Sequence, residues 1–118
     1  IVFMNIYKPG YILFVNVAFS GTVGYKRRPV GIISNDSFNK AGTKLVVAGI
    51  TSNITSPFRP GDTLLDNWKA AGLIKPSAVR GVLATVDCSD IIRKLGVMSE
   101  DDFKKVMQNI RSILEVES

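Results

Sequence analysis

The pattern of apolar and polar residues predicts several short β-strands separated by turns. Residues 10–17, 29–34, 44–50 and 78–86 are mainly apolar, and Gly, Pro, Asn, Asp or Ser residues stand at their ends. Residues 62–65 fit a fifth, shorter strand. A series of short strands joined by turns is typical of a small β-barrel, so we expect a mainly β fold.

The segments between these strands are predicted to be loops and short helical turns. Residues 20–28 form a glycine-containing basic loop, and residues 51–60 form a polar loop bounded by proline. Residues 66–72 fit a short helical turn that packs the single tryptophan. Residues 89–96 resemble a short helix that ends at Gly96.

The last part of the chain predicts an amphipathic helix. Ser99 is a favourable N-cap, and Asp102 follows at the position of a capping box. Apolar residues then recur at helical spacing, and this stripe can dock on the barrel, on another subunit or partly on both. The stripe consists of Phe103, Val106, Met107, Ile110, Ile113 and Leu114.

Composition indicates one globular domain over residues 1–118, with 46% hydrophobic residues. The longest apolar stretch, residues 12–19, is too short to span a bilayer, and no signal peptide is recognisable. Cys88 is the only cysteine, which fits a reducing cytoplasm. The chain contains no histidine, which excludes histidine-dependent catalysis and argues against a zinc site. We therefore expect a cytoplasmic protein without a cofactor or a membrane contact.

Positive charge is concentrated in the predicted barrel. Residues 1–80 contain ten Lys and Arg against three Asp and Glu, a net charge of +7. Residues 81–118 contain five against seven, a net charge of −2. A basic surface of this kind favours a polyanion such as a nucleic acid as its partner.

The densest basic segment lies next to two candidate hydroxyl groups. Three adjacent cations, residues 26–28, directly precede Pro29, which suits the first position of a strand because it lacks a backbone donor. We expect these cations on a loop against the end of a buried strand that the turn at residues 34–36 closes. Thr51 and Ser52 end the next strand, so the cations and hydroxyls together predict a phosphate site.

The order of these motifs resembles the MazF/PemK toxin family, whose members are small ribonucleases of toxin–antitoxin modules. The matching segments span nearly the whole chain, at residues 8–10, 26–30, 33–36, 50–52, 77–80 and 85–87. The resemblance implies an SH3-like small β-barrel with a C-terminal helix, commonly a homodimer. It also implies sequence-selective, metal-independent cleavage of single-stranded RNA, and inhibition by a cognate acidic antitoxin.

The resemblance assigns roles to particular residues. Arg28 and Thr51 would be catalytic, with Arg28 stabilising charge on the scissile phosphate, because a guanidinium holds its proton too tightly to be a good acid. Alternatively, Arg28 is a solvated cation and Thr51 makes a local turn. Substrate binding is predicted for Ser52, Lys26, Arg27, Arg80 and Tyr25, the last by stacking on a base.

Three departures from the family pattern leave other functions open. Tyr11 replaces an aspartate. The segment at residues 80–87 is one residue shorter than the common pattern, with Gly81 and Val82 where relatives often have an acid. The loop at residues 21–25 lacks the acidic residue that many members carry. Asp36 follows the basic strand but fits turn chemistry. Two alternatives to an endoribonuclease therefore remain: a nucleic-acid-binding barrel without catalysis, and a gyrase-directed toxin of the CcdB type.

Overall fold

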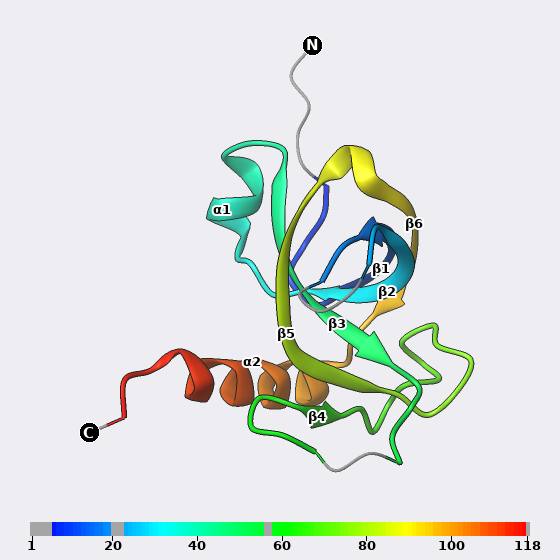
Figure 1. The fold of residues 1–118 in the computed structure, drawn as a ribbon, viewed down its shortest axis with the longest axis vertical. Coiled ribbons are helices and arrows are strands. Elements are labelled where there is room, and N and C mark those ends of the chain that lie inside the picture. The colour runs from blue at the N-terminus through cyan, green and yellow to red at the C-terminus, as the bar shows by residue number, and fades with distance from the viewer. Residues whose placement is uncertain (1–5, 20–22, 56–57, 118) are drawn as a thin grey trace.

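The computed structural model describes residues 6–19, 23–55 and 58–117. Within them the chain forms six strands, two α-helices and one 3₁₀ turn (Figure 1). In chain order these are β1 (Tyr11–Val17), β2 (Lys26–Ile32), α1 (Asp36–Lys40), β3 (Lys44–Thr51), β4 (Thr63–Leu64), β5 (Ala78–Asp87), η1 (Cys88–Asp90), β6 (Ile91–Val97) and α2 (Glu100–Leu114). The expected class, mainly β with a C-terminal helix, is confirmed.

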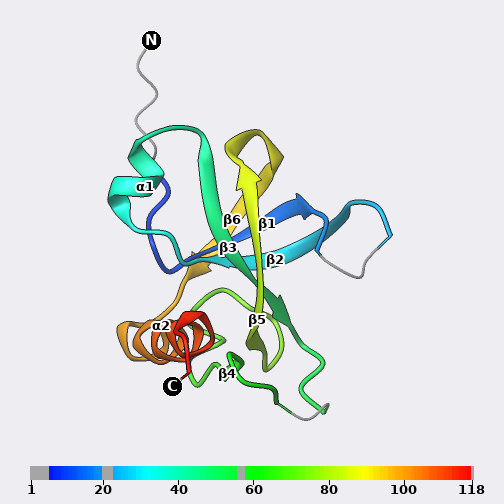
Figure 2. The ribbon, with the colours of Figure 1, turned by 60° about the vertical axis from the view of Figure 1, so that its left-hand side comes forward.

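The strands form one antiparallel sheet in the order β4-β5-β3-β2-β1-β6. The sheet curls strongly, as in a small barrel, but it is not closed, because β4 and β6 are its two edges (Figure 2). The helix α2 lies beside β4 and the lower end of β5. No helix among the described residues is long and apolar enough to cross a membrane.

Alternating side chains of the sheet enter two separate cores. One core lies between the sheet and α2 and contains Ile12, Ala48 and Val106. The other lies inside the curl of the sheet and contains Val30 and Val47 among others. Because successive residues of a strand face opposite sides, each position of a strand can be assigned to one core or the other.

The expected basic loop is wrong in its second half, because β2 begins at Lys26 and not at Pro29. Arg28 pairs with Val15 of β1, and Pro29 pairs with Phe14. Pro29 is tolerated inside the strand because β2 pairs with β3 only from Val30 onward. Up to Pro29, β2 has a neighbour on one side only, as an edge strand has.

The expected helix at residues 89–96 is also wrong. The segment contains the short turn η1 followed by β6. Asp87 caps η1 by accepting a hydrogen bond from the Ser89 N–H at 3.0 Å, and it also accepts one from the Thr43 hydroxyl at 2.9 Å. These contacts, with the Lys44 ammonium, lower the pKa of Asp87 well below its ordinary value. The β-branched residues that follow then pair with β1.

The turn predicted at residues 34–36 leads into the short helix α1, which begins at Asp36. Asn35 is the N-cap, and its side chain accepts a hydrogen bond from the Phe38 N–H at 2.9 Å. The helix turns Asn39 into the protein, where it is fully buried and donates to the Ser34 carbonyl at 3.0 Å. A helix of five residues is too short to show an apolar periodicity, so only its N-cap can be recognised in the sequence.

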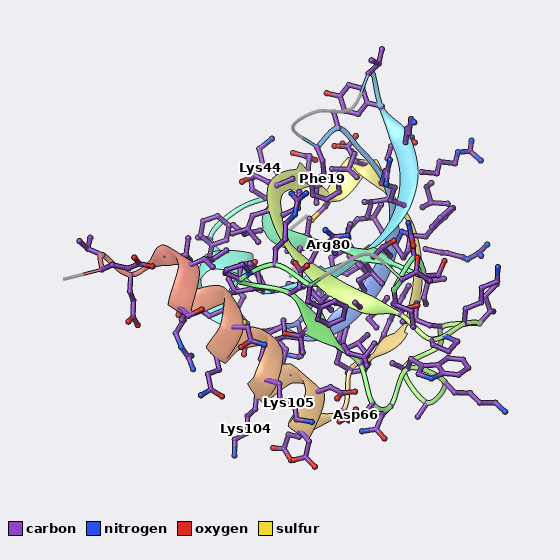
Figure 3. All side chains as sticks on the ribbon, turned by 60° about the horizontal axis from the view of Figure 1, so that its bottom comes forward. Phe19, Lys44, Asp66, Arg80, Lys104 and Lys105 are labelled. Carbon is purple, nitrogen blue, oxygen red and sulfur yellow. The ribbon has the colours of Figure 1, made fainter. Side chains whose placement is uncertain are left out.

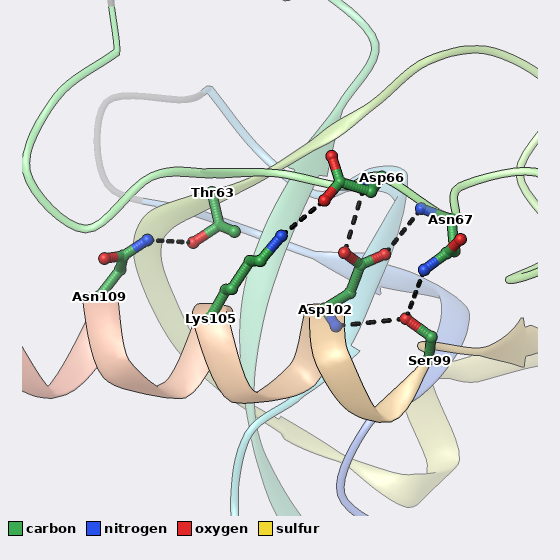
Figure 4. A network of polar contacts seen from close by, with 7 residues as sticks. All are labelled: Thr63, Asp66, Asn67, Ser99, Asp102, Lys105 and Asn109. Carbon is green, nitrogen blue, oxygen red and sulfur yellow. Dashed lines mark hydrogen bonds and ion pairs between the residues drawn. The ribbon is translucent and has the colours of Figure 1, made fainter.

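The helix α2 begins as expected, but the role of Asp102 differs. Ser99 accepts a hydrogen bond from the Asp102 N–H at 3.2 Å, which confirms the N-cap. The buried Asp102 carboxylate does not complete a capping box and accepts hydrogen bonds from the N–H groups of Asp66 and Asn67, at 3.1 and 2.8 Å (Figure 4). The helix is thereby attached to the turn at residues 66–72.

Candidate functional site

Three neighbouring strands bring the main candidate residues to one face of the sheet. Arg28 on β2, Thr51 on β3 and Arg80 on β5 are each an even number of residues away from members of the core inside the curl. Since β2, β3 and β5 are adjacent, the three side chains lie in a row. They line one pocket of about 250 Å³, together with Phe19, Gly49, Ile50 and Val82.

Arg28 enters this pocket from a half-buried position. Its Nε is buried and makes no hydrogen bond within the described part of the chain. No described carboxylate lies within ion-pair distance of its guanidinium. A buried donor without a partner is costly, so this group is suited to accept an anionic ligand.

Thr51 both makes a local turn and faces the pocket. Its Oγ1 accepts a hydrogen bond from the Asn53 N–H at 3.1 Å. Because the oxygen is oriented in this way, the hydroxyl proton is available to donate to a group inside the pocket. The two expectations for Thr51, a turn residue and a site residue, are therefore compatible.

Arg80 is oriented by a buried aspartate that sequence analysis did not identify. The Arg80 Nε lies 3.1 Å from Oδ2 of Asp62, whose side chain is only 4% exposed. The contact is an ion pair and not an aligned hydrogen bond, since this Nε has no hydrogen-bond partner among the described residues. Asp62 also accepts hydrogen bonds from the N–H groups of Gly81, at 2.9 Å, and Arg59, at 3.1 Å.

A β-bulge in β5 places Arg80 at the pocket. Ala48 of β3 pairs with Leu83, and Ile50 pairs with Val79, so two steps of β3 face four steps of β5. Residues 80–82 therefore lie opposite the single residue Gly49, an excess of two residues, and bulges of this kind re-aim side chains next to functional sites. Figure 3 shows Arg80 near Phe19 on this side of the sheet.

The remaining candidates lie outside the pocket. Ser52 lines a different hollow, because the residue after Thr51 faces the other side of the sheet. Lys26 and Arg27 are exposed on β2, and Arg27 faces away from Arg28. Tyr25 directly precedes β2, and its side chain is 75% exposed. The expected joint phosphate site of Thr51 and Ser52 is thus divided between two faces.

The pocket can bind an anion through cations and a hydroxyl. It contains two guanidinium groups, and Asp62 neutralises only one of them. Among the described residues that line it there is no carboxylate, thiol or imidazole. Within the described part of the chain, no group of three or more His, Cys, Asp or Glu residues could bind a metal ion.

Sequence analysis missed the residues that shape the pocket. Gly49 provides space, because a Cβ atom there would lie 3.4 Å from the Phe19 ring. The signal for Asp62 was present in the preceding Pro60-Gly61, which is typical of a type II turn. Gly61 has a φ of +96°, and the Asp62 N–H donates to the Arg59 carbonyl at 3.0 Å, so this turn directs the aspartate inward.

Comparison with known proteins identifies similar chains. A family model described as PemK-like, MazF-like toxin of type II toxin-antitoxin system matches residues 8–114. No curated protein matches the chain.

Solved structures with the same fold share only about a fifth of their residues with this chain. An endoribonuclease in complex with its cognate antitoxin from a mycobacterial species is 17% identical, with a TM-score of 0.75, covering 95% of this chain and 98% of that chain. The Mycobacterium tuberculosis toxin MazF-mt6 is 21% identical, with a TM-score of 0.71, covering 94% and 100%. A MazE–MazF structure from Deinococcus radiodurans is 18% identical, with a TM-score of 0.70, covering 94% and 97%.

The geometry of Asp62 makes a prediction about stability. Asp62→Ala should destabilise the protein by about 3 kcal/mol, because it leaves the Arg80 guanidinium and the Gly81 N–H without their acceptor. Urea unfolding followed by circular dichroism measures this change. Asp66→Ala is the matched control, since it removes an exposed carboxylate that pairs with Lys105 and should cost at most about 1 kcal/mol. Equal midpoints for the two variants would show that Asp62 does not anchor the bulge.

Proposed function

The chain belongs to the PemK-like, MazF-like toxins of type II toxin–antitoxin systems, and on this premise we propose that it is an endoribonuclease that cleaves single-stranded RNA without a metal ion. The observation that supports the activity most directly is the pocket that contains Arg28, Thr51 and Arg80. The same fold occurs in solved structures that are named endoribonucleases. The cytoplasm, where messenger RNA is exposed, is the proposed location.

In the proposed reaction the scissile phosphate lies between the two guanidinium groups of the pocket. The ribose 2′-oxygen attacks phosphorus, and the bond from phosphorus to the 5′-oxygen of the next nucleotide breaks. Solvent takes up the proton of the 2′-hydroxyl, and the leaving 5′-oxygen gains one proton from solvent. The products are a 2′,3′-cyclic phosphate, which water can open to a 3′-phosphate, and a 5′-hydroxyl end.

Charge stabilisation is the main contribution of the protein in this scheme. The phosphoryl oxygens gain negative charge in the transition state, and Arg28, which has no carboxylate partner among the described residues, can accept that charge. The Thr51 hydroxyl donates to one of these oxygens. Arg80, fixed by Asp62, positions the phosphate from the opposite side of the pocket.

The exposed candidates bind the rest of the substrate. Lys26 and Arg27 contact the RNA backbone, which supplies affinity without sequence selectivity. Tyr25 stacks on an unpaired base, for which its exposed ring is suited. Ser52 contacts the substrate from the other face of the sheet, beyond the end of β3.

One observation favours a second candidate function, RNA binding without cleavage. Val82 lines the pocket at a position where relatives often have an acid, and none of the described lining residues can act as a general base near neutral pH. The protein would then bind single-stranded RNA without cleaving it. The cleavage assay described below distinguishes the two functions.

Two protein partners are part of the proposal. The first is a cognate acidic antitoxin, and solved structures of similar toxins with an antitoxin support a partner of this kind. In the proposal this antitoxin competes with RNA for the basic pocket. A second copy of the chain would cover the groove of about 500 Å³ between α1 and α2, whose walls include Phe38, Met107 and Leu114. Leu114 is 65% exposed in the single chain, which leaves the end of the apolar stripe of α2 uncovered.

The first test of the proposed function is cleavage in the absence of metal. A long single-stranded RNA incubated with the protein in EDTA should be cut, and the new 5′ ends should accept phosphate from polynucleotide kinase without phosphatase treatment. Arg28→Ala purified in the same way controls for contaminating ribonucleases, which also leave such ends. Products with 5′-phosphates, or a strict requirement for Mg²⁺, would rule out this chemistry.

The second test separates the two adjacent arginines of β2. Arg28→Ala should lower the cleavage rate about 10²–10³-fold, because it removes a donor that acts in the transition state. Arg27→Ala should mainly weaken RNA binding and reduce the slope of log affinity against log salt concentration by about one. Single-turnover cleavage and binding in a salt series measure both effects. If the two variants behave alike, the assigned roles are wrong.

The third test concerns inhibition by the antitoxin. The toxin co-expressed and purified with the acidic protein encoded beside it should not cleave RNA, because that protein occupies the pocket. Amide hydrogen exchange at Arg28 and Thr51 should be slower in the complex than in the free toxin. A complex that cleaves as fast as the free toxin would contradict competition for this surface.

A further inference from the structure

The sheet is open between β2 and β3 beside the pocket. The two strands pair only from Val30 to Ile32. Beyond this point residues 26–29 of β2 pair with β1, and residues 50–51 of β3 pair with β5, so the strands diverge. The pocket lies on one side of this divergence, where Arg28 and Thr51 face it.

Two joined hollows lie on the opposite side of the same divergence. They have volumes of about 230 and 220 Å³, and both are lined by Pro29, Leu73 and Ile74. We call them together the rear groove. Ser52 lines one of the two hollows, so the residues that follow Arg28 and Thr51 in the chain both face the rear groove. The pocket and the rear groove are thus separated by no more than the ends of two strands.

The rear groove combines flat or apolar surfaces with positive charge. The Arg93 guanidinium lies over the Phe14 ring, 5.5 Å from its centroid, and both residues line the groove. Lys75 is the second cation of its lining, and no described lining residue is acidic. Arg27 extends the same face, because the pair Asn16–Arg27 lies two residues along from the pair Phe14–Pro29. This charge complements a polyanion.

We propose that the rear groove binds a nucleotide of the RNA on one side of the scissile phosphate, with its base against Ile74 and Pro29 and its phosphate near Lys75 or Arg93. This inference rests on the proposed function, and it names a second substrate subsite. Single-stranded RNA is recognised through unstacked bases that pack on apolar, aromatic or guanidinium surfaces, and cations beside them bind the backbone. The positive charge alone would also attract an acidic peptide segment, and continuity with the pocket favours RNA as the occupant.

Ile74 provides a clean substitution site. Its side chain is 91% exposed, so Ile74→Asp removes an apolar contact and adds a negative charge with little effect on folding. Val116→Asp is the matched control, because Val116 is 97% exposed, lies in the C-terminal tail and is absent from the pocket and the rear groove. Both variants change the net charge equally.

The experiment compares RNA oligonucleotides centred on a mapped cut site and shortened stepwise from either end. With the unaltered protein, lengthening the RNA on one side of the cut site should raise kcat/KM. Ile74→Asp should lower kcat/KM for this longer RNA about tenfold. With Val116→Asp, the longer RNA should show the same rise in kcat/KM as with the unaltered protein. Lys75→Ala should reduce the salt dependence of binding by about one charge.

A second measurement is independent of cleavage. An RNA with a 2′-deoxy nucleotide at the cut site should shift the Ile74 methyl signals in NMR spectra but not those of Val116. If the protein cleaves RNA while Ile74→Asp and the methyl signals show no effect, the rear-groove subsite is refuted and the proposed function stands. If these changes alter only antitoxin affinity, the groove binds protein and the inference is wrong. If the unaltered protein neither binds nor cleaves RNA, both proposals fail.

Discussion

The buried carboxylate of Asp62 is the contact on which the geometry of the site depends. A carboxylate that is 4% exposed needs compensating partners, and here these are two backbone N–H donors and the positive charge of the Arg80 guanidinium. The backbone carbonyl of the same residue lies 3.3 Å from the donating side-chain amide of Asn109. One residue therefore joins the turn before β4, the bulge of β5 and the helix α2.

The second constraint is the alternation of side chains along adjacent strands. Arg28 and Thr51 are separated by many residues in the chain, but each stands in step with a core residue of its own strand, whereas Arg80 is placed by the bulge of β5. The core that fixes the register of the sheet therefore also fixes which side chains reach the pocket. The same rule sends Arg27 and Ser52 to the other face, so neighbouring residues of similar chemistry have different surroundings.

The sequence was sufficient to predict the class of fold, the C-terminal helix and the proximity of Arg28 and Thr51, which line one pocket. It failed where tertiary contacts override local signals. The sequence predicts a loop before Pro29 because proline is unfavourable inside a strand, and only the divergence of β2 from β3 allows proline there. Asp62 was missed for a related reason: its partner, Arg80, is distant in the chain, and a two-residue bulge brings the two together.

The doubled arginine of β2 has a consequence for how relatives are aligned. At about 20% identity, a relative's arginine in this strand can be aligned with Arg27 as well as with Arg28, so a slip of one residue is easily overlooked. The shift would nevertheless exchange the two faces of the strand and assign the pocket residue of one protein to the outer surface of another. The buried Val30 and Ile32, which alternate with Pro29 and Gly31, are the positions that expose such an error.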